Sequence, residues 1–160
     1  MDADRDAVVR GVGKVCIAAS SLEWSMAYCA SVIRRAGDAW FIRVYATPGQ
    51  TRKEFQELMR NVAAKFPEQK AASERLLADA KDLLDQRNRV VHSAVASERD
   101  PGSRFYDAWH AKTDTLWPVD PEGLRNLAHQ IDRCAREIDH FGTAWEEHAE
   151  RDGWPDLTKP

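Results

Sequence analysis

The first quarter of the chain carries apolar residues at alternating spacings of four and three. Such spacings keep the side chains on one face of a helix, so residues 4–36 are predicted to form a single long helix. A seam held over four repeats can bury its apolar face only against other helices. The seam consists of Val8, Val12, Val15, Ala19, Leu22, Met26, Cys29 and Ile33. The chain is therefore expected to build a helical bundle.

Turn and capping signals divide the rest of the chain into further helices. Thr51 and Glu54 have the spacing of a capping box, and Asp120 followed by Pro121 is typical of a helix start. The four main helices are expected at 4–36, 51–66, 67–94 and 121–149. This pattern predicts an all-α fold, an up-and-down bundle of four main helices. The domain is expected to span residues 1–150, followed by a C-terminal tail at residues 151–160.

Two segments between these helices have a different pattern. Residues 39–46 are apolar and rich in aromatic and β-branched side chains, which is compatible with a strand; we interpret them as an irregular or short helical segment. Residues 97–120 form a long, irregular polar connection before the last helix, and connections of this length are usually functional or partly structured. Within it, residues 106–119 have the pattern of a short hairpin.

Composition bounds the class of protein and its compartment. With 43% hydrophobic and 31% charged residues, the chain resembles an ordinary globular protein. A membrane helix needs about 18 consecutive apolar residues, and no run in the sequence approaches that length. Three cysteines at helical positions lack zinc-site spacing and are interpreted as reduced core thiols. We therefore expect a cytoplasmic protein with no membrane partner, no metal and no cofactor.

The third predicted helix places polar side chains inside an apolar stripe near its C-terminal end. Arg87 lies four residues after Leu83 and three before Val90, in the middle of that stripe. Arginine is rarely buried without a partner, so this position predicts an anion or an interface. Asn88 and His92 are four residues apart and are therefore neighbours at the edge of the stripe.

The pattern Arg-Asn-x-x-x-His on a late helix of a helical chain resembles the HEPN superfamily, and the likeness extends loosely over residues 1–140. The resemblance implies a metal-independent endoribonuclease whose catalytic residues match Arg87, Asn88 and His92 here. It further implies a homodimer in which two subunits place their motifs together in a cleft. A toxin or defence effector, with a cognate antitoxin or defence partner, is the biological role that this resemblance suggests.

The residue types suit RNA strand cleavage without a metal. Histidine titrates near neutral pH and can act as base or acid, and the forked donors of arginine match phosphate oxygens. Arg87 and His92 are about 140° apart on an ideal helix, so two subunits converge them better than one. Arg89 points off the stripe and is expected to contact the RNA backbone. Glu23, a polar interruption of the first helix, is predicted to pair with Arg87.

Other interpretations of these residues stay open. Arg87 is also compatible with a structural salt bridge, and His92 with a helix-end histidine favoured by the helix dipole. The alternative function is a non-catalytic helical dimer that serves as an RNA- or protein-binding module. Residues 1–93 carry a net charge of +3 and residues 94–160 a net charge of −6, which permits only a local phosphate-binding patch. His110 is interpreted as a surface or edge residue.

Overall fold

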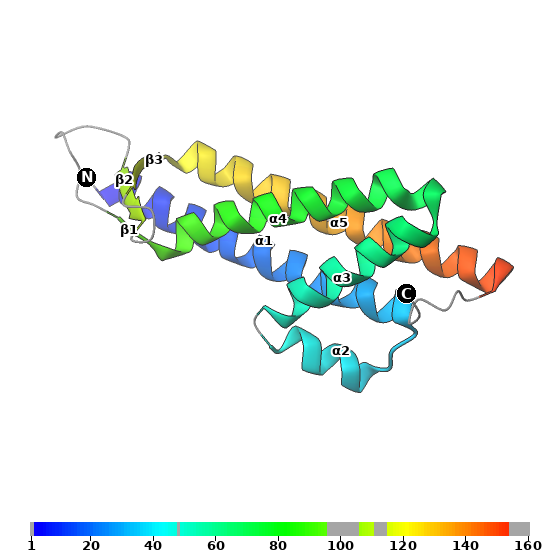
Figure 1. The fold of residues 1–160 in the computed structure, drawn as a ribbon. Helices are drawn as coiled ribbons and strands as arrows, with labels where there is room; N and C mark the ends of the chain where they lie inside the picture. The colour runs from blue at the N-terminus through cyan, green and yellow to red at the C-terminus, as the bar shows by residue number, and fades with distance from the viewer. Residues whose placement is uncertain (1, 48, 96–105, 111–114, 154–160) are drawn as a thin grey trace. The chain divides into compact units, whose positions relative to one another are not determined.

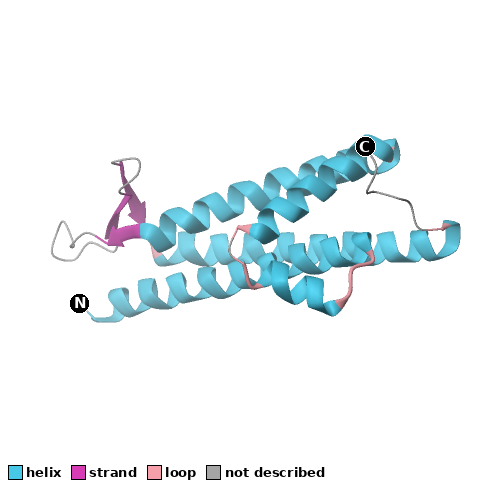
Figure 2. Cartoon of the chain, turned by 60° about the horizontal axis from the view of Figure 1, so that its bottom comes forward, coloured by secondary structure: helices cyan, strands magenta, loops and turns pink. Residues whose placement is uncertain are grey.

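The computed structural model describes residues 2–47, 49–95, 106–110 and 115–153 (Figure 1). The elements in chain order are α1 (Asp2–Arg34), α2 (Asp38–Tyr45), α3 (Gln50–Lys65), the 3-10 helix η1 (Pro67–Gln69), α4 (Lys70–His92), β1 (Ser93–Val95), β2 (Tyr106–His110), β3 (Thr115–Val119) and α5 (Pro121–Asp152). The protein belongs to the all-α class, as predicted, with one small sheet between α4 and α5 (Figure 2).

The chain divides into two compact units. One comprises residues 1–20 and 81–132, and we call it the motif unit because it contains Arg87, Asn88 and His92. The other comprises residues 21–80 and 133–160, and we call it the α2–α3 unit. The long helices α1, α4 and α5 each contribute one stretch to both units. The up-and-down arrangement of the four main helices stays a prediction.

The core of both units begins with the predicted seam of α1. Seven of its eight positions are buried, with Val12 as the half-buried exception. In the motif unit the buried partners from α4 and α5 are Leu83, Leu84, Val90, Leu124, Leu127, Ala128 and Ile131. In the α2–α3 unit the buried partners come from α3, α4 and α5 and include Phe55, Leu58, Met59, Val62, Leu76, Ile138 and Trp145. The helical periodicity of α1 therefore predicted which of its faces is buried.

Glycine lets α1 and α5 approach closely in each unit. In the motif unit, a Cβ added at Gly11 would lie 2.8 Å from Cδ1 and 2.9 Å from Cβ of Leu124. In the α2–α3 unit, a Cβ added at Gly142 would lie 3.4 Å from the Cα of Cys29. Gly13, by contrast, has no atom within 4 Å of such a Cβ. The two glycines near the start of α1 thus have different surroundings, and α1 is helical through both.

The sheet follows α4 without an intervening loop. The strands pair antiparallel in the order β1-β2-β3, and β2 with β3 forms the predicted hairpin. Ser93 is the Cα partner of His110 across the first pair of strands. Helix α4 therefore ends at His92, two residues earlier than the sequence predicted, because the chain becomes extended at Ser93. Residues 96–105 and 111–114 of the long connection lie outside the described residues.

Helices α3 and α5 begin in different ways. The backbone N–H of Gly123 donates to Oδ1 of Asp120 at 2.8 Å, which confirms the predicted N-cap of α5. The capping box predicted for α3 is wrong. Its N-cap is Gly49, with φ of 81°, and the Thr51 hydroxyl donates instead to the Val44 carbonyl at 3.0 Å. That bond ties the end of α2 to α3, and residues 39–46 lie mostly in this short helix as interpreted from the sequence.

One described helix meets the length and composition criteria for crossing a membrane. It is Asp6–Arg34 of α1, with a mean hydropathy of 1.2 over its best window. The expectation that the chain has no membrane partner stays a prediction. A core helix meets the same criteria, and 56% of the window is buried inside the protein.

The two glycines of α1 provide a matched pair of stability measurements. Gly11→Ala forces Leu124 and its backbone to shift, and we expect a net loss of roughly 1–2 kcal/mol in the free energy of unfolding. Gly13→Ala meets no atom and should gain about 0.5–1 kcal/mol from helix propensity. Urea denaturation followed by circular dichroism measures both. Equal effects of the two substitutions would contradict the close approach at Gly11.

Candidate functional site

Arg87 and Asn88 form the described part of the candidate site. Both side chains are half-buried on α4, next to the buried Leu83, Leu84 and Val90. Nη1 of Arg87 donates to Oδ1 of Asn88 at 3.0 Å. Nε of Arg87 is buried without a hydrogen-bond partner within the described part of the chain. Asn88 thus orients the guanidinium but satisfies only part of its donors.

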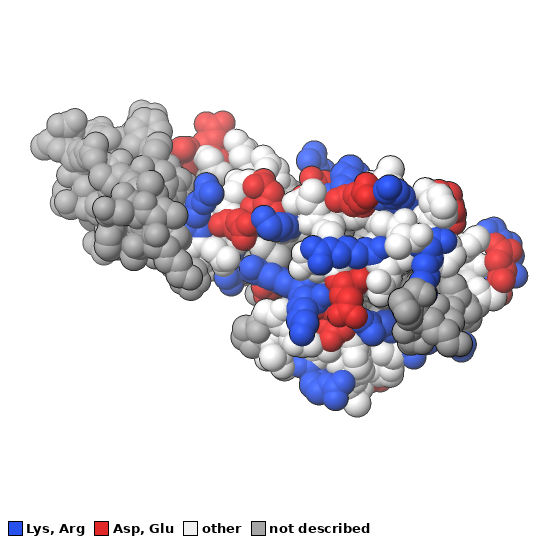
Figure 3. Space-filling view, in the orientation of Figure 1, with Lys and Arg blue, Asp and Glu red and all other residues white. Residues whose placement is uncertain are grey.

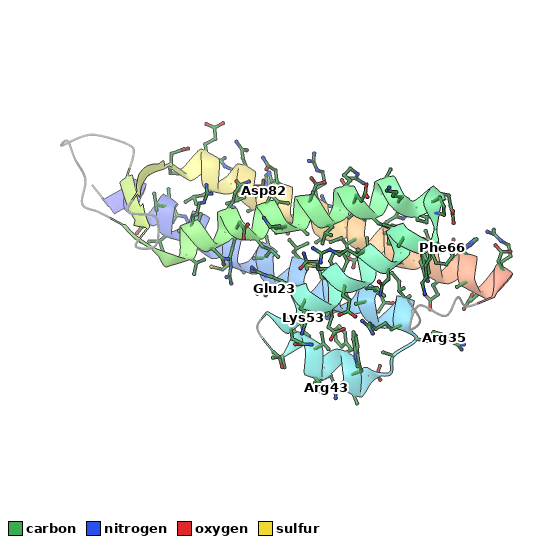
Figure 4. The ribbon with its side chains drawn as sticks, in the orientation of Figure 1. Glu23, Arg35, Arg43, Lys53, Phe66 and Asp82 are labelled. Atoms are coloured by element: carbon green, nitrogen blue, oxygen red, sulfur yellow. The ribbon has the colours of Figure 1, made fainter. Side chains whose placement is uncertain are left out.

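The nearby acids of α4 are engaged elsewhere. Asp85 pairs with Lys81 at 3.4 Å, and Asp82, labelled in Figure 4, accepts a hydrogen bond from Gln86 at 2.8 Å. Among the described residues of the motif unit, no carboxylate lies within ion-pair distance of Arg87. A half-buried cation with unused donors favours an added anion, because the charge has lost part of its hydration.

His92 is the last residue of α4, and its side chain lies outside the described part of the structure. The next residue, Ser93, begins β1 and faces His110 of β2 across the ladder. The backbone therefore brings a second histidine position to the end of the motif. Sequence reasoning missed His110 as a candidate, because only the strand register reveals this neighbour, although the hairpin itself was predicted.

Glu23 pairs with a cation that the sequence did not indicate. Its carboxylate accepts a hydrogen bond from Nη2 of Arg52 at 3.4 Å, and both side chains are half-buried. Figure 4 labels Glu23 on α1 within the α2–α3 unit. Arg87 belongs to the motif unit, so the pair expected between Glu23 and Arg87 stays a prediction. In the structure, Arg52 is the residue that neutralises Glu23.

Two cysteines are structural rather than nucleophilic. Burial, with a smaller contribution from Asp139, raises the pKa of the Cys29 thiol far above its usual value. Burial also raises the pKa of Cys134 to about 12, with Asp79 and Glu137 adding to the shift. Because only the thiolate is a good nucleophile, neither residue suits catalysis. Within the described residues, no group of three or more His, Cys, Asp and Glu side chains is arranged to hold a metal ion.

The remaining predicted site residue, Arg89, is exposed on α4, as a contact to an RNA backbone requires. No protein-family model, curated protein or solved structure matches the chain.

Arg87→Met tests whether the guanidinium lacks a partner in the folded protein. Because methionine keeps the apolar stem and removes a half-buried charge, we expect the free energy of unfolding to stay constant or to rise. Arg75→Met is the matched control, since Arg75 is exposed and pairs with Asp79 and Glu137, and its loss should stay below about 1 kcal/mol. Denaturation curves compare the two. A loss above roughly 2 kcal/mol for Arg87→Met would support a structural salt bridge instead.

Proposed function

We propose that this chain is a metal-independent endoribonuclease, similar to the HEPN superfamily, that cuts RNA by attack of the substrate's own 2′-hydroxyl. The observation that supports the proposal is the incomplete hydrogen bonding of the Arg87 guanidinium. The guanidinium is half-buried, held by Asn88, and lies beyond ion-pair distance of the described carboxylates of the motif unit. An RNA phosphate supplies the missing anion in the bidentate geometry that arginine prefers.

Three residues of the motif would bind the RNA phosphates. Arg87 would hold a nonbridging phosphate oxygen and offset the charge that develops on phosphorus during attack. The Asn88 amide accepts from Arg87 through its oxygen, so its nitrogen remains to donate to a second phosphate oxygen. Arg89, exposed on the same helix, would contact a neighbouring phosphate without reading the base. We give Glu23 no part in the reaction, because Arg52 already pairs with it.

Proton transfer requires two groups. One group removes the proton of the 2′-hydroxyl as the 2′-oxygen bonds to phosphorus, and the other protonates the 5′-oxygen as the P–O5′ bond breaks. His92 can serve as either. The second group is His110, whose backbone lies across the ladder from Ser93, or the partner subunit's His92. The products of either arrangement are a 2′,3′-cyclic phosphate and a 5′-hydroxyl.

A homodimer is part of the proposal. The motif unit leaves large apolar side chains exposed, among them Val9, Val91 and Ile17, the last with 70% of its surface open. Val91 lies directly before His92, inside the motif. A second subunit covering Val91 would bury this apolar surface and place two motifs in one cleft. A toxin or defence effector of the cytoplasm, restrained by a cognate antitoxin or defence partner, is the role we propose for such an enzyme.

The charge of the motif unit favours one alternative. Residues 1–20 and 81–132 hold 10 Lys/Arg and 12 Asp/Glu, a net charge of −2. Such a unit attracts nucleic acid weakly at long range. The second candidate is therefore a non-catalytic helical dimer, in which the motif binds RNA or another protein and Arg87 pairs with an acid of its partner.

Cleavage of structured RNA by the purified protein is the decisive measurement. We expect cutting to continue in EDTA, to leave 2′,3′-cyclic phosphate ends and to spare DNA, because the attacking group is the 2′-hydroxyl. His92→Ala should lower the rate roughly 10²–10⁴-fold through loss of acid–base catalysis. Arg89→Ala should mainly weaken binding and reduce its dependence on salt.

His110→Ala identifies the second proton-transfer group. A loss as large as that of His92→Ala assigns the role to His110, whereas retained activity assigns it to the partner subunit's His92. His129→Ala, on an exposed position of α5, is the matched control and should leave the rate unchanged. A requirement for divalent metal, or full activity of His92→Ala, would rule out the proposed mechanism. A well-folded dimer that cuts no RNA would favour the binding module.

The dimer has its own test in light scattering at micromolar concentration. The wild-type mass should be twice that of the 18.1 kDa chain. Val91→Glu should yield a folded monomer, because it places a charge on the proposed interface. Ile42→Glu changes an equally apolar, exposed residue of the α2–α3 unit and should leave the dimer intact. A monomeric wild-type protein would contradict the proposed interface.

A further inference from the structure

The small sheet of the motif unit has two edges that differ in their chemistry. Its strands follow the order β1-β2-β3, so in the described part of the chain β1 and β3 each have a neighbouring strand on one side. Strand β3 contains Pro118, and proline blunts an edge because it has no backbone N–H to donate. Strand β1 contains neither a proline nor a charged residue. It is therefore the edge that another strand can extend.

The position of Pro118 indicates which backbone groups of β1 point away from the sheet. Pro118 is the Cα partner of Asp107, and a proline in an edge strand keeps its nitrogen on the outer side. Bonding direction alternates along an antiparallel strand, so Asp107 bonds toward β1, and so does the residue two positions later. That residue is the Cα partner of Ala94, which therefore bonds inward. The N–H and C=O groups of Ser93 and Val95 then point outward.

We propose that β1 pairs with β1 of a second copy of the chain, antiparallel and about a two-fold axis at Ala94. In this register Ser93 faces the partner's Val95, and each such pair exchanges two N–H···O bonds. All outward groups of the strand are then bonded, because the edge is complementary to itself. The pairing rests on the dimer of the proposed function and names its contact, but it requires no cleavage of RNA.

Two observations favour a second copy over a strand from another protein. Val91, two residues before β1, is 37% exposed and belongs to the proposed dimer interface, so the pairing continues that surface along the chain. Charges of both signs are interspersed over α4 in Figure 3, whereas residues 90–97 contain no Lys, Arg, Asp or Glu. Two copies can therefore meet along β1 without bringing like charges together.

The register also relates the two motifs to each other. His92 comes two residues before Ala94, so the two His92 positions lie on either side of the axis. Their separation along the strands is roughly 14 Å, at about 3.4 Å per residue. Both motifs then lie beside one two-fold axis, as the cleft of the proposed function requires.

Amide hydrogen exchange followed by NMR compares the two edges of the sheet. The Val95 N–H points outward from β1, and the matched control is the Leu116 N–H, which points outward from β3 because Leu116 is two residues before Pro118. In the wild-type dimer we expect the protection factor of Val95 to exceed that of Leu116 roughly tenfold or more. Val91→Glu, the monomeric variant, should remove this difference. Equal protection in the wild-type dimer, or a Val95 amide that stays protected in the monomer, would overturn the pairing.

A proline at the outward position tests the backbone bonds separately from the side chain. Val95→Pro removes an N–H that the sheet itself does not use, and it should convert the dimer to a monomer of 18.1 kDa in light scattering. Val95→Thr is the matched control, because it keeps both the N–H and a β-branched side chain, and it should stay dimeric. The Ala94 amide, bonded toward β2, should stay protected in both variants and reports an intact sheet. A dimeric Val95→Pro variant, or a monomeric wild-type protein, would contradict the pairing.

These measurements contain no RNA, so they separate the pairing from the proposed catalysis. A dimer with a protected Val95 amide that cuts no RNA would retain the pairing and contradict the ribonuclease. An active ribonuclease whose Val95 amide exchanges like that of Leu116 would contradict the pairing alone.

Discussion

The structure depends on covering one helix, α1, along its whole length. A helix of 33 residues is stable in water mainly through packing of its apolar face, because the helix propensity of each residue contributes little free energy. Each unit contributes segments that cover its own part of the seam, and glycine lets α5 approach α1 in both, through Gly11 in one and Gly142 in the other. Most of the apolar face of α1 is buried in the core. The candidate functional residues therefore lie on the surfaces that stay exposed.

Periodicity and capping signals predicted the all-α class, the buried seam, the N-cap at Asp120 and the hairpin before α5. These features depend on residues that are close together in the sequence, so the sequence alone is enough to predict them. The start of α3 was predicted wrongly because the Thr51 hydroxyl bonds to Val44, seven residues away, rather than to its own helix. A side chain that has both a local and a tertiary partner cannot be assigned from spacing alone.

The candidate site was predictable only in part, for the same reason. Spacing identified Arg87 and Asn88 as adjacent polar residues beside an apolar stripe, and the structure adds the bond between them. Arg52 as the partner of Glu23 follows from packing between helices, and His110 as a neighbour of the motif follows from strand register. The edge contact of Trp24 on α1 with Phe41 on α2 follows from packing between helices in the same way.

The direct passage of α4 into β1 has a consequence for heat stability. A three-residue strand is held by few bonds and opens at a lower free energy than a helix with a buried face. His92 stands at this junction, so local opening of the sheet releases the end of the motif while the core remains packed. Loss of the proposed RNase activity on warming should therefore precede loss of helical signal, and the temperature difference between the two reports the stability of the sheet alone.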